Sequence, residues 1–153
     1  MKYRTRKLLY LYMSESSLQS AIYLNDARAE TLTNQITDNS EDLRLLQKHS
    51  SVDIQNVRNN YAPEKERLQN EINGLDKVEQ QDEYQELLTE LKDLKEAEQE
   101  EIKTLEEKLN DKETGVQLEN ETLEVQLEEI NTQTESFKEM LKQAIEKNYG
   151  YFQ

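Results

Sequence analysis

Apolar side chains recur at alternating steps of four and three residues along the N-terminal third of this sequence. Eight of the 11 positions in this first run are apolar, and the run consists of Leu11, Glu15, Leu18, Ile22, Asn25, Ala29, Leu32, Ile36, Asn39, Leu43 and Leu46. A spacing that averages about 3.5 residues keeps one stripe of a helix facing a partner helix, as in the seam of a left-handed coiled coil. The pattern therefore predicts helices that pack side by side.

The same spacing returns near the C-terminus. Eight of 11 positions are again apolar in the run Val116, Asn120, Leu123, Leu127, Ile130, Thr134, Phe137, Leu141, Ala144, Asn148 and Tyr151. Each run keeps its register for about five heptads, which is the strongest kind of secondary-structure signal in a single sequence. We predict an all-α fold, an elongated coiled coil built as a long helical hairpin of two or three helices.

The composition favours a narrow apolar seam between helices rather than a broad hydrophobic core. Hydrophobic residues make up 34% of the chain and charged residues another 34%. A chain this polar can bury a stripe between helices but not a three-dimensional core. With three Gly and one Pro in 153 residues, the sequence also has few of the residues that form turns and disordered linkers.

The middle of the chain is less regular and holds the candidate helix ends. The best predicted interruption is Asn59–Pro63, because Pro suits the first turn of a helix. A second is residues 110–115, and Gly74 is a further candidate. Between Leu94 and Ile102 the seam falls on Ala97 or Glu98 and is weak. We expect helices that end near residue 60, run from Pro63 to about Lys112, and run from Val116 to about Asn148.

These breaks divide the chain into three predicted segments. Residues 1–62 form an N-terminal helical segment with a basic and aromatic tip, and residues 63–112 form an acidic central helix. Residues 113–153 form a C-terminal coiled-coil helix with an aromatic end.

Two sets of residues are predicted to mediate assembly. The assembly seam consists of Leu11, Leu18, Ile22, Leu32, Ile36, Leu43, Leu123, Leu127, Ile130, Phe137 and Leu141. Aromatic rings gather at both ends of the chain, where they exceed the needs of a two-helix seam and are typical of a contact surface. The predicted terminal contacts are Tyr3, Tyr10, Tyr12, Tyr149, Tyr151 and Phe152. Packing of these rings on one another within one molecule is the alternative.

Four asparagines occupy seam positions: Asn25, Asn39, Asn120 and Asn148. A buried Asn weakens a coiled coil but selects its register and oligomeric state when it pairs with another polar group. The four residues therefore indicate a specified assembly. Exposure on a wider bundle is the alternative for some of them.

The net charge of −14 is unevenly distributed. Residues 1–70 hold 10 Lys/Arg and 9 Asp/Glu, a net charge of +1, whereas residues 71–153 hold 9 Lys and 24 Asp/Glu, a net charge of −15. An acidic half argues against a nucleic-acid partner, which requires a basic stripe. A basic N-terminal tip beside an acidic body could attract the next molecule in a stack.

The sequence lacks the residues that catalysis and metal binding require. It contains one His, His49, and no Cys, and His49 with Asp53 at i, i+4 supplies only two metal ligands. The stretches from Asp38 and from Asn110 resemble calcium loops but lack essential ligands or the central Gly. We expect neither an enzyme nor a cofactor.

The N-terminus superficially resembles an export signal. A basic stretch, residues 2–7, precedes an apolar run at Leu8–Met13 that is too short for a signal peptide and has no cleavage site after it. No run reaches the roughly 18–20 apolar residues of a membrane span. We expect no membrane contact, and a location that is cytoplasmic or reached by a specialised, non-cleaving export route.

Two functions fit these features. The first is a self-assembling structural subunit of a filament or tube, whose main partner is a second copy of itself. The second is a rod-like adaptor, scaffold or chaperone of a secretion or phage assembly, which binds a protein client. In architecture alone, the chain is similar to helical filament subunits, to small coiled-coil accessory proteins of bacterial secretion and flagellar systems, and to phage structural components. It carries no family-specific motif.

Overall fold

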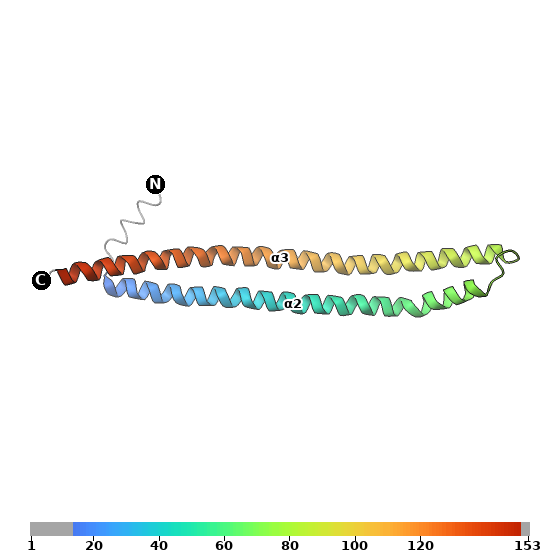
Figure 1. Cartoon of the computed structure of the whole chain (residues 1–153), viewed down its shortest axis with the longest axis horizontal. Coiled ribbons are helices and arrows are strands. Elements are labelled where there is room, and N and C mark those ends of the chain that lie inside the picture. The colour runs from blue at the N-terminus through green and yellow to red at the C-terminus, as the bar shows by residue number, and fades with distance from the viewer. Residues whose placement is uncertain (1–13, 151–153) are drawn as a thin grey trace, which may run out of the picture. The chain divides into compact units, whose positions relative to one another are not determined.

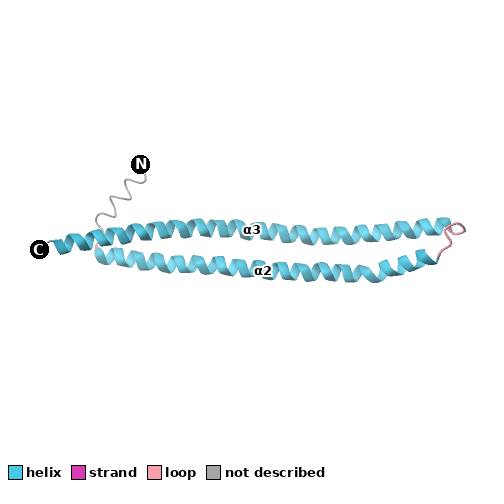
Figure 2. Ribbon diagram, viewed as in Figure 1, coloured by secondary structure: helices cyan, strands magenta, loops and turns pink. Residues whose placement is uncertain are grey.

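The computed structural model describes residues 14–150, and the side chains of residues 14–148. Two helices account for nearly all of this part, α2 at Glu15–Gly74 and α3 at Gln81–Gly150, and no strand occurs within it (Figures 1 and 2). The prediction of an all-α hairpin is confirmed, with two helices. Two compact units make up the chain: unit 1 is Met1–Ser40 with Gln117–Gln153, and unit 2 is Glu41–Val116.

Unit 2 contains the reversal of the chain at residues 75–80. Asp76 organises this connection, because its Oδ1 accepts hydrogen bonds from the backbone N–H groups of Val78 at 2.9 Å and Glu79 at 3.3 Å. The Gln80 side chain accepts a hydrogen bond in return from the Asp76 N–H at 3.2 Å. This reciprocal arrangement satisfies backbone donors that have no partner at a helix start. The same two backbone bonds lower the pKa of the Asp76 carboxyl.

The core of unit 2 lies next to this reversal. Leu68, Ile72 and Leu91 are buried together. Side chains from the start of α3 complete the cluster, namely Tyr84, Leu87, Leu88 and Leu94. Burial of large apolar side chains is the main stabilising contribution in a chain of this kind. The hairpin is therefore anchored close to its turn.

The predicted break at Asn59–Pro63 is wrong, because α2 continues through Pro63 to Gly74. A proline inside a helix removes one hydrogen bond and costs about 3 kcal/mol or more. Packing on both sides of it offsets that cost, since Val57 and Leu68 are both buried in unit 2. Gly74, which the sequence offered as a further candidate for a helix end, is the last residue of α2.

The predicted break at residues 110–115 is also wrong, because α3 runs through Gly115 without interruption. Glycine inside a helix costs only about 0.5–1 kcal/mol relative to alanine, which is too little to end a helix whose seam packs on both sides. Glu113 and Val116 are half-buried at seam positions beside it. The second and third predicted helices are thus one helix.

We expect Gly115→Ala to raise the free energy of unfolding by about 0.5–1 kcal/mol. An added Cβ at Gly115 would meet no atom within 4 Å, and the residue lacks a positive φ. Urea unfolding followed by circular dichroism, at one protein concentration, measures the change. A destabilised variant would show that residue 115 lies in a turn, as the sequence had suggested.

Unit 1 pairs the beginning of α2 with the end of α3 in an antiparallel arrangement. Asn25 contacts Gln133 and Asn39 contacts Asn120, so residue numbers rise on one helix as they fall on the other. Leu18 and Phe137 are the buried apolar side chains of this unit within the described residues. Unit 1 therefore has a thinner apolar core than unit 2.

Candidate assembly surface

The predicted seam residues face the partner helix, but most are not fully buried. Leu18 and Phe137 are buried. The others are half-buried: Ile22, Leu32, Ile36, Leu123, Leu127, Ile130 and Leu141 in unit 1, and Leu43 in unit 2. Leu11 lies outside the described residues. A single partner helix covers one side of each of these side chains and leaves the flank open to solvent.

The terminal contacts lie beyond what the structure describes. Tyr3, Tyr10, Tyr12, Tyr151 and Phe152 fall outside the described residues. Tyr149 lies in the last turn of α3, but its side chain is not among those described. The role of these rings in assembly stays a prediction.

Three of the four seam asparagines, Asn25, Asn39 and Asn120, are buried or half-buried and pair with polar groups across unit 1, whereas Asn148 is exposed. Asn25 is only 3% exposed, and its Nδ2 donates to Gln133 Oε1 at 3.2 Å. Asn39 Nδ2 donates to Asn120 Oδ1 at 2.9 Å. Asn148, which is exposed, donates to the Glu15 carboxylate. The Asn25–Gln133 and Asn39–Asn120 pairs favour one register of the two helices, because a slipped pairing would leave a part-buried amide without its partner.

A charged pair fills the weak part of the seam in unit 2. Glu98 is buried at this position, and its carboxylate accepts a 2.5 Å hydrogen bond from Lys65 Nζ. One turn away, a hydrogen bond to Glu101 raises the pKa of the Tyr61 hydroxyl. The seam is therefore continuous here, with an ion pair in place of an apolar contact.

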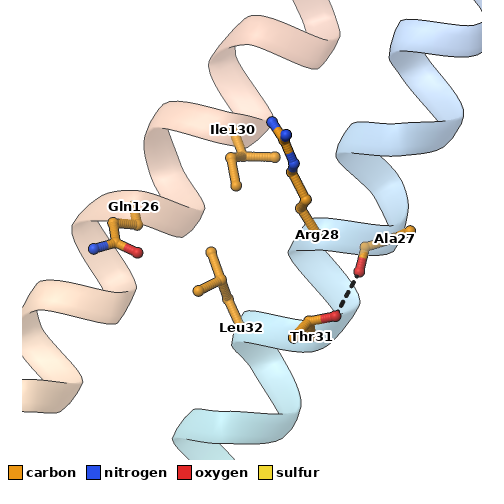
Figure 3. Close-up of a pocket in the computed structure, with 6 residues that line it drawn as sticks. All are labelled: Ala27, Arg28, Thr31, Leu32, Gln126 and Ile130. Carbon is orange, nitrogen blue, oxygen red and sulfur yellow. Dashed lines mark hydrogen bonds between the residues drawn. The ribbon is translucent and has the colours of Figure 1, made fainter.

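A shallow groove opens between the helices of unit 1, with a volume of about 350 Å³. Leu32 and Ile130 lie between the two helices and form its apolar floor, and Arg28 extends toward α3 beside Ile130 (Figure 3). The rest of the lining consists of Ala27, Thr31 and Gln126. Thr31 donates its hydroxyl proton to the Ala27 carbonyl, which leaves its methyl group for the groove wall. The groove combines an apolar floor with one cation.

Exposed apolar side chains form a second feature of unit 1. Leu118 is 59% exposed and Val125 is 57% exposed, and they lie seven residues apart on α3. Tyr23 and Leu24 are exposed on α2. In unit 2 the large apolar side chains that are exposed are those of Leu45, Val52 and Val78. Leu118 and Val125 lie outside the predicted seam, and their seven-residue spacing is the signal in the sequence that could have identified them.

Unit 1 carries acidic residues on both helices, and its cations within the described residues are Arg28 on α2 and Lys138, Lys142 and Lys147 on α3. Arg28 is the only cation between residues 14 and 40, whereas residues 117–137 contain six Glu and no Lys or Arg. Among the residues that the structure describes, Arg28 forms no ion pair. The same holds for Glu119, Glu121, Glu124, Glu128 and Glu129. Both signs of charge are therefore available to a partner.

No cluster of metal ligands emerges from the described part of the chain. No group of three or more His, Asp or Glu side chains within residues 14–148 is placed to hold a metal ion. His49 is exposed on α2. The described helices also include none that is long and apolar enough to cross a membrane.

No protein-family model, no curated protein and no solved structure matches this chain.

Proposed function

We propose that the chain is a self-assembling structural subunit, whose copies associate through the helical surfaces of unit 1 into a filament or tube. The observation that supports this most directly is the incomplete burial of the seam. Leucines and isoleucines at seam positions are normally covered when a coiled-coil core is complete. Here Leu32, Ile36 and Leu127 stay half-buried after intramolecular pairing. Further helices from other copies would cover their open flanks.

The small core within each unit supports the same proposal. Within the described residues, six apolar side chains are buried, namely Leu18, Val57, Leu68, Ile72, Leu91 and Phe137. A pair of helices buries little apolar surface compared with the conformational entropy that the chain loses on folding. Association would add the missing burial, because covering the open flank of a half-buried leucine contributes a part of the roughly 1.5–3 kcal/mol that full burial of an exposed leucine provides.

The paired asparagines favour a defined assembly over indiscriminate association. Asn25 and Asn39 are bonded across the seam to Gln133 and Asn120, so they hold one register within the subunit. A subunit with a fixed register presents the same outer surface in every copy, as a regular filament requires. The acidic net charge of −14 would limit unspecific aggregation.

Negative-stain electron microscopy, combined with light-scattering mass, tests the proposal on the purified full-length chain at low and physiological salt. We expect particles with a regular repeat and a mass that grows with protein concentration. A monomer at all concentrations would contradict self-assembly. Discrete complexes of two to four chains would favour the alternative function, an adaptor, scaffold or chaperone for a protein client.

A further inference from the structure

We propose that Val125 of one copy docks into the groove between α2 and α3 in unit 1 of a second copy, while Leu118 packs beside the groove on exposed Leu24. This inference rests on the proposed self-assembly and names the surfaces that would carry it. The row formed by Leu118 and Val125 is called the apolar row, and the site lined by Ala27, Arg28, Thr31, Leu32, Gln126 and Ile130 is called the groove.

The dimensions of the two surfaces correspond. Residues seven positions apart on a helix lie on one face, separated by about 10.5 Å. That is the distance from Leu118 to Val125, and also the distance along α2 from exposed Leu24 to Thr31 in the groove wall. The strip from Leu24 to Leu32 is therefore long enough for both side chains of the apolar row. The volume of about 350 Å³ accommodates a valine or leucine side chain between Leu32 and Ile130.

The charges correspond as well. Glu121, Glu128 and Glu129 lie one turn before and after Val125, on the same side of α3. They are exposed, and within the described residues none has a cationic partner. Arg28 is the cation of the groove (Figure 3). When Val125 of one copy enters the groove of another, these carboxylates come next to Arg28. Partial burial would strengthen the attraction.

The apolar row and the groove belong to different faces of the same unit. Val125 and the groove residue Gln126 are consecutive on α3, so their side chains leave the helix about 100° apart. A copy therefore does not fill its own groove with its own apolar row. When one copy has docked, the pair still presents one free groove and one free row. Such a heterologous contact propagates head to tail and builds a filament.

Two charge-introducing variants test the contact, each with a matched control. Val125→Glu places a carboxylate in the apolar row, and Val52→Glu makes the same change in unit 2 at a similar exposure, 52% against 57%. Arg28→Glu reverses the charge of the groove, and Arg58→Glu makes the same change at an exposed position of unit 2. All four positions are exposed, so the helix content of the variants should remain that of the wild type.

We expect Val125→Glu and Arg28→Glu to raise the protein concentration at half-assembly at least about tenfold. The controls should assemble like the wild type. Light scattering across a concentration series measures the half-point, and circular dichroism verifies the fold. Wild-type assembly by Val125→Glu or by Arg28→Glu would overturn the proposal, since the charges would then lie outside the contact.

Mixing the two variants tests whether the row and the groove contact each other. The Arg28→Glu chain retains an intact apolar row, and the Val125→Glu chain retains an intact groove. We expect the mixture to form a one-to-one complex that grows no further, because the remaining ends are both defective. A mixture that stays unassembled would overturn the pairing of these surfaces. If the wild type itself is monomeric, the proposed function fails; if it assembles and the variants behave like the controls, this contact alone fails.

Discussion

Leu68→Ala should lower the free energy of unfolding by about 2–5 kcal/mol. Leu68 is 0% exposed and belongs to the buried cluster with Ile72 and Leu91 in unit 2. Removing three carbon atoms there forfeits apolar burial and leaves a cavity that neighbouring side chains fill only in part. No other residue of the described chain combines a large apolar side chain with such complete burial in a defined cluster.

Urea unfolding of the full chain, followed by circular dichroism, measures this effect. Because association stabilises the folded state by mass action, wild type and variant are compared at one protein concentration. Leu45→Ala is the matched control: it is the same substitution at a side chain 37% exposed, and it should cost less than about 1 kcal/mol. A loss at Leu68 no greater than the loss at Leu45 would show that the cluster does not form in solution.

Lys65→Met should be the next most damaging change, with a loss of about 1–3 kcal/mol in the free energy of unfolding. The substitution keeps the length of the side chain but removes the only cation bonded to Glu98 within the described residues. The Glu98 carboxylate, whose side chain is 11% exposed, would then remain in the seam without a partner. An unpaired charge that is largely removed from water is far less favourable than the ion pair.

The double variant Lys65→Met with Glu98→Leu separates the ion pair from the packing around it. Replacing both charges by apolar side chains of similar size is often neutral or stabilising. We expect the double variant to regain the stability that Lys65→Met loses, in the same urea experiment. A double variant as unstable as the single one would mean that the loss does not come from the unpaired Glu98 carboxylate.

The helical hairpin was predictable because one physical signal runs through most of the chain. Every described position of the first predicted run, from Glu15 to Leu46, is buried or half-buried. The second run behaves in the same way from Val116 to Ala144. A two-helix fold has one contact stripe, so the stripe in the sequence and the stripe in the structure coincide.

The positions of the helix ends were not predictable, because local preferences compete with packing. Pro63 and the stretch before Gly115 carry the stronger turn signals, yet both lie inside helices. The actual turn at residues 75–80 contains neither Gly nor Pro, and it is stabilised by the Asp76 side chain. Propensity differences of about 1–3 kcal/mol are smaller than the burial of the side chains around Pro63.

The candidate contact surface was only partly predictable. The assembly seam contributes Leu32 and Ile130 to the groove. Arg28 belongs to no apolar stripe, and a single exposed arginine carries no signal of its own in a sequence, whereas Val125 is marked only by its seven-residue spacing from Leu118. Their significance depends on which side chains stand open beside them once the helices have paired, which only the structure provides.

The difference between the two units also sets an order for folding. The Lys65–Glu98 contact closes a loop of 33 residues, whereas Asn39–Asn120 spans 81 residues and Asn25–Gln133 spans 108. Closing a long loop in one step loses more chain entropy than extending a hairpin from an existing turn. Folding should therefore nucleate beside Asp76, and pairing of the helices should extend outward from there.

Leu68→Ala should accordingly slow refolding in stopped-flow experiments, and unchanged refolding would contradict this order. The amide pairs of unit 1 then form late in folding, and they form only in the correct register. A hairpin that has paired in a wrong register lacks the Asn39–Asn120 hydrogen bond, and it has to reopen before the groove can form.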